Sequence, residues 1–272
     1  SIGGTPESVT EDCTDSAGGW SYDAGTATLT LDGFQGEYIE ANGDINIVLK
    51  GKNKITISAE STEGIKSTGK VTIDDTISPV QDCLDIYCSD GTESVSMIYT
   101  GGFGADYATY IVGGTVNLVE ENTRRRYVTG ISRWAYVEND ASLNINLSAD
   151  GGRNGVAALL NLNTSGDTSF RVNSLSSSSY GVYSLDKKGS GDTALVAEGK
   201  AKNIDNKFTI GSTGNTGKIT IKGYLTDFTP YRKKNRIVGV DNFLWSYFTE
   251  NPQTGGLCRC VCDSLGVPIK DF

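Results

Sequence analysis

Residues Glu63–Asp74 have the sequence Glu-Gly-Ile-Lys-Ser-Thr-Gly-Lys-Val-Thr-Ile-Asp, which predicts a short glycine-led strand, a turn and an alternating strand. The alternating strand recurs along the chain as pairs of apolar residues two positions apart, with a period of roughly 25 residues. Because a spacing of two places side chains on one face of a strand, we expect each pair to point inward. The pairs are Ile45/Ile47, Val71/Ile73, Val95/Met97, Val116/Leu118, Leu143/Ile145, Phe170/Val172, Ala194/Val196 and Ile219/Ile221.

A second series of short strands precedes most of these pairs and keeps step with them. Its members are Tyr38-Ile39, Gly64-Ile65, Leu84-Asp85-Ile86, Tyr110-Ile111, Gly130-Ile131, Gly155-Val156 and Gly181-Val182. A repeat of this length cannot bury its apolar face alone, whereas stacked repeats form one continuous core. The sequence therefore predicts an all-β protein, a right-handed parallel β-helix (β-solenoid) of about eight coils, with the hand taken from the general preference for right-handed parallel crossovers.

The period divides the chain into three parts. Residues 1–35 are expected to form an N-terminal segment and a capping hairpin, in which Trp20–Tyr22 and Ala27–Leu31 flank a turn. Residues 36–223 are expected to form the β-helix. Residues 224–272 are expected to form an irregular C-terminal cap and a cysteine-containing tail, in which 241–248 is either a short helix or an aromatic strand.

Composition narrows the range of functions. The chain has 272 residues, with 24 basic and 33 acidic side chains and a net charge of -9, so its average surface repels nucleic acid and anionic membranes. No apolar run approaches the ~18 residues of a membrane span, and we expect a soluble protein. Six cysteines and the absence of an initiator methionine favour a secreted, extracellular or cell-surface protein whose signal has been removed. The absence of histidine excludes catalytic triads and imidazole-ligated zinc.

Three segments, Gly19–Leu31, Gly43–Gly51 and Gly64–Ile73, resemble repeats in β-helical cell-surface proteins of anaerobic microbes. The resemblance includes the clostridial carbohydrate-binding β-helix family, which binds cellulose and pectin. It implies a β-helix, an extracellular location and, more weakly, carbohydrate binding. That family also holds calcium with clustered aspartates between coils. The residues that correspond here, and the only metal candidates, are Glu60, Glu63, Asp74 and Asp75; no other cofactor is expected.

A basic segment, Arg124-Arg125-Arg126, interrupts the acidic surface, and Arg133 and Trp134 follow it. Consecutive arginines on a strand would alternate between faces, so the segment is expected to be a loop. One interpretation is an ordinary solvated loop. The other is a binding patch for an acidic polysaccharide, because arginine binds carboxylates through a bidentate fork. Aromatic residues that could stack on sugar rings are Trp20, Tyr38, Tyr99, Tyr107, Tyr110, Trp134, Tyr180 and Tyr183.

The cysteines suggest both local and long-range bonding. Cys83 and Cys88 either form a disulfide across a tight turn or remain as buried thiols. Cys258, Cys260 and Cys262 alternate near the end of the chain, far from Cys13 if the repeats form a rod. Either the tail runs back along the rod, or these cysteines bond to a neighbouring subunit.

Three functions follow from these observations. The first is a non-catalytic extracellular structural protein that forms a homo-oligomer or polymer as a sheath, filament or surface layer. The second is an adhesin that binds plant or acidic polysaccharide. The third is a polysaccharide lyase, in which Arg124, Arg126 or Arg133 would act with Asp140; fold analogy alone does not confer such an activity, and we expect no catalysis.

Overall fold

The computed structural model describes residue 2 and residues 9–75, 82–121, 123–210, 217, 219–222, 243–250, 257–262 and 268–271. Nearly all of their regular structure is β-strand, with one short 3-10 helix, η1 (Ala105–Tyr107). Most strands pair in parallel, so the expected all-β fold with parallel sheets is confirmed. None of the helical structure in these residues is long and apolar enough to cross a membrane.

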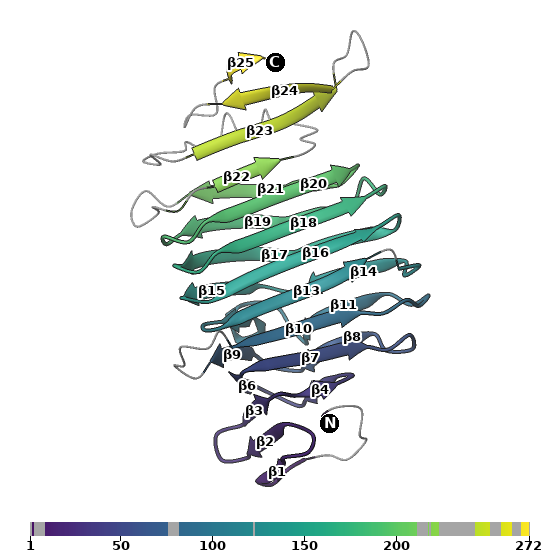
Figure 1. The fold of residues 1–272 in the computed structure, drawn as a ribbon, viewed down its shortest axis with the longest axis vertical. Coiled ribbons are helices and arrows are strands. Elements are labelled where there is room, and N and C mark those ends of the chain that lie inside the picture. The colour runs from purple at the N-terminus through teal and green to yellow at the C-terminus, as the bar shows by residue number, and fades with distance from the viewer. Residues whose placement is uncertain are drawn as a thin grey trace.

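Two sheets run along the length of the molecule (Figure 1). The second sheet contains one strand from each successive repeat of the chain, followed by the strands of the C-terminal segment. In order, its strands are β4 (Gln35–Gly36), β7 (Lys52–Ile57), β10 (Cys83–Cys88), β13 (Thr115–Glu121), β16 (Ser142–Ala149), β18 (Thr168–Ser174), β20 (Thr193–Gly199), β22 (Ile219–Lys222), β23 (Phe243–Glu250), β24 (Leu257–Cys262) and β25 (Pro268–Asp271).

The first sheet contains two rows of strands that merge. One row is β5 (Ile39–Ala41), β8 (Glu63–Ser67), β11 (Val95–Thr100) and β14 (Tyr127–Ile131). The other is β3 (Thr28–Asp32), β6 (Ile45–Lys50), β9 (Val71–Asp75), β12 (Thr109–Ile111) and β15 (Ala135–Asn139). The long strand β17 (Gly152–Thr164) pairs with both β14 and β15, and β19 (Tyr180–Lys188) and β21 (Lys202–Ile210) follow it.

We call one strand of the second sheet, together with the first-sheet strands that follow it, a repeat. Successive repeats are aligned residue by residue: Cys83 lies opposite Thr115, which lies opposite Ser142. Outward-facing polar side chains follow the same register. The Asn117 amide donates to Asp85 across 32 residues at 2.6 Å, and the Asn144 amide donates to Asn117 across 27 residues at 3.0 Å. Each repeat therefore contacts mainly the repeats before and after it.

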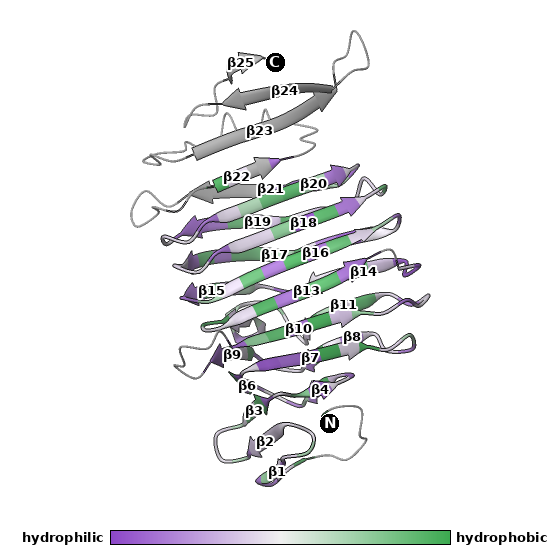
Figure 2. Ribbon diagram, in the orientation of Figure 1, coloured by the Kyte–Doolittle hydropathy of each residue, from purple (hydrophilic) through white to green (hydrophobic). Residues whose placement is uncertain are grey.

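The core lies between the sheets and consists of the inward side chains of every strand. Figure 2 shows apolar and polar bands alternating along strands of the second sheet. The predicted core positions Ile47, Ile73, Val116 and Ile145 are at most 1% exposed, which confirms them. Ile221 lies on β22, but its side chain is outside the described residues.

Two details of the predicted repeat are wrong. The apolar pairs do not form one ladder, because Ile45/Ile47 lie in the first sheet and Leu143/Ile145 in the second. The pair Ala194/Val196 also faces outward, whereas Leu195 and Ala197 on the same strand are buried. All four residues from 194 to 197 are apolar, so alternation alone gives two equivalent registers.

Both ends of the stack contain antiparallel strands. The predicted hairpin is confirmed as β2 (Trp20–Asp23) paired with β3, and β1 (Cys13–Asp15) extends it. Trp20 and Tyr22 pack against the first buried residues, as a cap requires. At the other end β23 pairs in parallel with β22, and β24 and β25 pair in antiparallel fashion beyond it. β23 agrees with the aromatic-strand alternative predicted for 241–248, whereas β24 and β25 are regular strands in a tail that was expected to be irregular.

Candidate functional site

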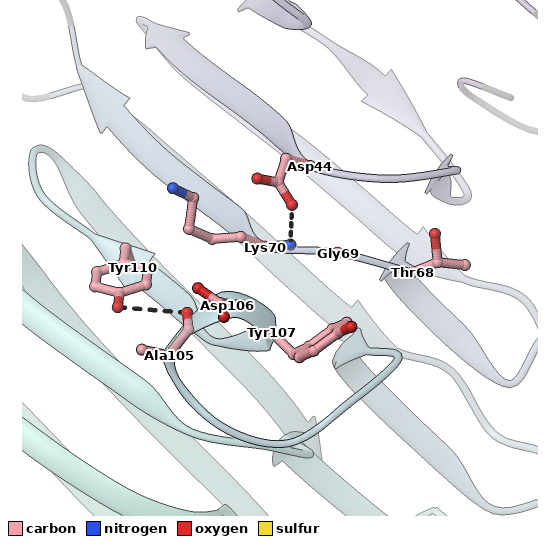
Figure 3. A pocket seen from close by; sticks show the side chains of 8 residues that line it. All are labelled: Asp44, Thr68, Gly69, Lys70, Ala105, Asp106, Tyr107 and Tyr110. Carbon is pink, nitrogen blue, oxygen red and sulfur yellow. Dashed lines mark hydrogen bonds between the residues drawn. The ribbon is translucent and has the colours of Figure 1, made fainter.

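The candidate site is a hollow of about 480 Å³ on the outer surface of the first sheet. Residues from three repeats line it: the turns that precede β6 and β9, and the loop between β11 and β12 that contains η1 (Figure 3). The residues around it are Asp44, Thr68, Gly69, Lys70, Ala105, Asp106, Tyr107 and Tyr110.

Glycines give the β11–β12 loop its shape. A Cβ atom at residue 102 would lie 2.5 Å from the ring of Tyr107, so only glycine lets that ring lie close to the backbone. Gly104 has φ of 95°, a conformation that other residues rarely adopt. The hydroxyl of Thr100 donates to the carbonyl of Tyr107, and the amide of Ala108 donates to the carbonyl of Ala105 at 3.3 Å. The loop is therefore fastened at its base.

Two tyrosines form the aromatic wall of the hollow. Tyr107 is 40% exposed. Tyr110 stacks on Tyr136 of the next repeat, with ring centroids 4.5 Å apart and planes 4° from parallel. Its hydroxyl donates to the carbonyl of Ala105 at 3.4 Å. Desolvation is the main cause that raises the pKa of Tyr110, and the charges of Tyr136, Glu138 and Asp106 add to it. Tyr110 is thus half-buried and held by contacts to Tyr136 and Ala105, whereas Tyr107 is exposed.

Charged groups lie on the other sides of the hollow. Asp44 accepts a hydrogen bond from the backbone amide of Lys70 at 2.8 Å. Gly69 makes this contact possible, since a Cβ there would lie 2.3 Å from the same carboxylate oxygen. The ammonium of Lys70 lies 5.9 Å from the centroid of the Tyr110 ring. Asp106, on η1, is exposed.

Arg133 supports the loop from the following repeat. Its guanidinium lies 4.3 Å from the ring centroid of Phe103 and 5.4 Å from that of Tyr99, and its Nε donates to the carbonyl of Thr100 at 3.3 Å. Phe103, at the loop, is 74% exposed. Of the predicted polyanion residues, Arg133 and the half-buried Trp134 are thus the two that lie near the candidate site.

The other three predicted arginines point in different directions. They do lie in a loop, between β13 and β14, as expected. Arg124 is exposed and pairs with Asp90 at 2.8 Å. Arg126 is exposed and lies over the ring of Tyr127. Arg125 is 1% exposed and therefore cannot contribute to a surface patch, which corrects that part of the prediction.

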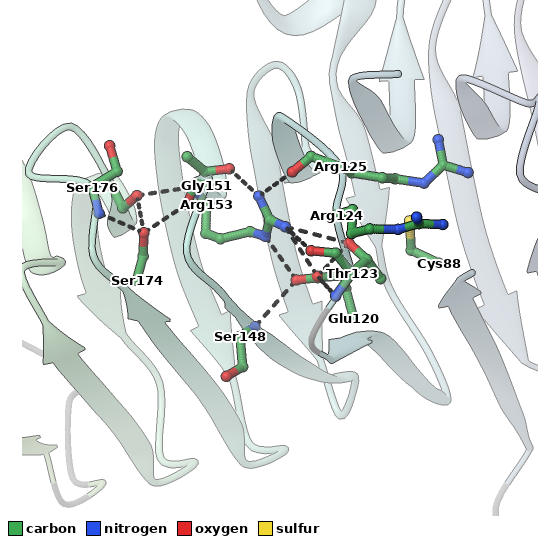
Figure 4. A network of polar contacts seen from close by, with 12 residues as sticks. Cys88, Glu120, Thr123, Arg124, Arg125, Ser148, Gly151, Arg153, Ser174 and Ser176 are labelled. Carbon is green, nitrogen blue, oxygen red and sulfur yellow. Dashed lines mark hydrogen bonds and ion pairs between the residues drawn. The ribbon is translucent and has the colours of Figure 1, made fainter. Parts of the chain in front are cut away.

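Arg125 extends inward between repeats (Figure 4). Its guanidinium donates to the carbonyls of Ser58 at 2.6 Å, Ser61 at 3.1 Å, Ser89 at 2.9 Å and Glu93 at 3.4 Å. These carbonyls belong to the turns after β7 and β10. The guanidinium thus occupies a carbonyl-lined space inside the stack, where its charge is matched by backbone dipoles.

Two further buried cations were not predicted. Arg153 pairs with Glu120 at 2.9 Å, and both side chains are fully buried (Figure 4). Glu120 also accepts hydrogen bonds from the amides of Thr123 and Ser148, each at 3.2 Å. Lys187 is fully buried and donates to the carbonyls of the two residues that follow it; burial lowers its pKa to about 8. These groups hold turns together from inside.

The carboxylates proposed for calcium do not come together. Glu60 and Glu63 lie in the turn before β8 and at its start, whereas Asp74 and Asp75 end β9. Among the described residues, no three acidic or cysteine side chains form a group that could hold a metal ion. Of the residues considered for a lyase, Arg124 and Arg126 share one turn, whereas Arg133 and Asp140 lie in two others.

Of the two predicted alternatives for Cys83 and Cys88, the structure has free thiols and no disulfide, although Cys83 is only half-buried. The two residues are the first and last of strand β10, and both are free thiols. An extended strand separates such residues by about 16 Å and points them to opposite faces. Cys88 is buried, and desolvation raises its pKa to about 11. Cys13 is also free, while the side chains of Cys258, Cys260 and Cys262 lie outside the described residues.

The sequence suggested Tyr107 and Tyr110 among eight aromatic candidates, but it gave no reason to join them with Asp44, Lys70 and Asp106. One signal existed, since Asp44 and Lys70 are 26 residues apart, close to one period of the repeat. Comparison of the chain with protein-family models, with curated proteins and with solved structures gave no match, so the chemistry of these residues is the basis for interpreting the site.

Proposed function

We propose that this protein is a non-catalytic, extracellular carbohydrate-binding protein built as a right-handed parallel β-helix of about eight coils. Parallel strands aligned over successive repeats support the architecture. The resemblance of residues 19–75 to β-helical surface proteins is consistent with the location.

The observation that carries the proposal is the hollow beside Tyr107 and Tyr110. Sugar rings have apolar C–H faces that stack on aromatic rings, and hydroxyl groups that need hydrogen-bond partners at the rim. The tyrosines supply the aromatic rings for stacking. The hydrogen-bond partners for the hydroxyl groups are the exposed side chains of Asp44, Thr68 and Asp106. Because Tyr110 is stacked on Tyr136, little side-chain entropy remains to be lost on binding.

Replacing Tyr107 with Ala is expected to weaken glycan binding about tenfold, as loss of one stacking partner and its buried area predicts. The measurement is depletion of the protein by a panel of insoluble polysaccharides, followed by titration with soluble oligosaccharides of the best binder. Tyr87→Ala is the matched control, because Tyr87 is 36% exposed on the outer face of the second sheet. Loss of binding in Tyr87→Ala alone would contradict the proposed site.

Self-assembly is the second candidate function, and the positions of the cysteines favour it. Cys13 lies on β1, and Cys258, Cys260 and Cys262 lie on β24, at the opposite end of the stack (Figure 1). A tail that stacks beyond β22 does not return to Cys13. Bonds between these positions would therefore join neighbouring molecules end to end, as a sheath, filament or surface layer requires.

Electrophoresis of the oxidised protein without reductant is expected to show a ladder of multiples, which a reduced sample lacks. Cys13→Ser should reduce the ladder to dimers or smaller species, because one of the two ends can no longer bond. Cys88→Ser is the control, since this buried thiol lies within the stack. A single monomer band under both conditions, with a monomeric mass by light scattering, would remove the assembly proposal and leave glycan binding unaffected.

A further inference from the structure

The charges at the hollow distinguish between classes of sugar. Asp44 and Asp106 contribute two carboxylates, and Lys70 contributes one ammonium, so the lining has a net negative charge. No ion pair within 4.0 Å involves any of these three side chains among the described residues. Among the described residues, no donor forms a hydrogen bond with the carboxylate of Asp106. Asp44 accepts the hydrogen bond from the Lys70 amide through Oδ1 alone. Both retain the capacity to bind a cation.

One ammonium group, that of Lys70, already lies at the hollow. The Nζ atom of Lys70 lies over the Tyr110 ring at 5.9 Å, within the range of a cation–π contact. Desolvation is the main cause that raises the pKa of Tyr110, and Glu138 and Asp106 lie close enough to its hydroxyl to add to that rise. An ammonium on a bound sugar would meet the carboxylates of Asp44 and Asp106, which line the same hollow.

We infer that the hollow selects glycans that carry free amino groups, such as polymers of de-N-acetylated hexosamine. This inference rests on the proposed carbohydrate-binding function and specifies its ligand. The sugar ring stacks on the exposed ring of Tyr107, and its protonated amine pairs with Asp106 and Asp44.

The same charges oppose acidic glycans, which the arginine-rich segment had suggested as ligands. Arg125 is buried, and Arg124 is paired with Asp90 on a different turn, so neither offsets the carboxylates at the hollow. Arg133 lies nearer, but its guanidinium is held over the rings of Phe103 and Tyr99 and donates to the carbonyl of Thr100. The protein as a whole carries a net charge of -9, which draws cationic polymers toward the surface and repels polyuronates. Amino glycans are favoured both at long range and at the site.

The test compares three soluble oligosaccharides of equal length by calorimetric titration: a glucosamine oligomer, the same oligomer fully N-acetylated, and an oligogalacturonate. At a pH where the amine is protonated, we expect the glucosamine oligomer to bind at least tenfold more tightly than its acetylated form, and the oligogalacturonate not to bind. Asp106→Asn and Asp44→Asn should each reduce the preference about fivefold, because each removes one ion pair of roughly surface strength. Asp150→Asn changes the net charge equally at an exposed position elsewhere and should leave the preference unchanged.

The outcomes separate the two proposals. Equal binding of the amino and acetylated oligomers, lost in Tyr107→Ala, would overturn the inference and leave carbohydrate binding intact. Failure to bind any glycan would overturn both. An oligolysine of equal charge that binds as tightly as the glucosamine oligomer would also overturn the inference, because it would show recognition of charge without sugar.

Discussion

Ile145→Asp is expected to abolish folding. Ile145 is 1% exposed on β16, in the middle of the stack, between Leu118 and Phe170 on the neighbouring strands. The change gives up about 2 kcal/mol of apolar burial and places a carboxyl group without partners in the core, at a further cost of several kcal/mol. Against a typical total of about 10 kcal/mol, such a loss removes most of the stability. The measurement is the β-sheet signal in far-ultraviolet circular dichroism, with solubility after expression.

Val196→Asp is the matched control, because it also replaces an apolar strand residue with Asp. Val196 faces outward on β20, between Arg171 and Lys222 on the adjacent strands. We expect this variant to fold, with a change below about 1 kcal/mol in the free energy of unfolding. Unfolding of Val196→Asp together with a stable Ile145→Asp would show that the inward and outward faces have been assigned the wrong way round.

Glu120→Gln is expected to destabilise the protein by about 3–5 kcal/mol, because it leaves the buried guanidinium of Arg153 without a counter-charge. The side chain keeps its shape, but the amide NH2 cannot accept the bonds that one carboxylate oxygen accepts from Ser148 and Arg153 or from Thr123 and Arg153. Arg153 would retain its bonds to the carbonyls of Arg125 at 3.1 Å and Gly152 at 2.9 Å, which do not neutralise it. Thermal unfolding should show a midpoint lower by on the order of 10 °C.

Glu198→Gln provides the comparison. Glu198 pairs with Arg171 at 3.0 Å, but their side chains are 43% and 56% exposed, and such pairs contribute less than about 1 kcal/mol. The double variant Glu120→Leu, Arg153→Met should be more stable than Glu120→Gln, since it removes both charges. If Glu120→Gln costs no more than Glu198→Gln, the buried pair does not support the turn between β13 and β14.

Much of the fold could be predicted because inward-facing and outward-facing side chains alternate along each strand of the stack. At Ile73, Val116 and Ile145 an apolar residue alternates with polar neighbours, and only one register buries it. The same rule failed for Ala194–Ala197, where every residue is apolar. It also could not predict inward-facing Arg125, Arg153 and Lys187. The two arginines are stabilised by backbone carbonyls and one buried carboxylate from distant parts of the chain, whereas Lys187 donates to the carbonyls of the next two residues.

The candidate site was harder to predict than the fold, because it depends on which turns become neighbours. Asp44 and Lys70 lie one repeat apart, and Asp106 lies on an enlarged loop in the repeat that follows. The one local indication was the glycine-rich sequence Gly101–Gly104, which predicts a loop; in the structure it begins the long connection 101–108 between two strands of the same repeat. The periodic apolar pattern predicts where strands lie, but it does not predict which loops between them are enlarged.

Arg125 has a consequence for the cooperativity of unfolding. In a repeat protein each unit normally interacts with its immediate neighbours alone, so the array can unfold stepwise from one end. The guanidinium of Arg125 contacts turns one and two repeats earlier, and its own carbonyl accepts a bond from Arg153 in the repeat that follows. These contacts connect non-adjacent units, so the segment from β7 to β17 should melt as one block, while the later repeats can fray independently of it.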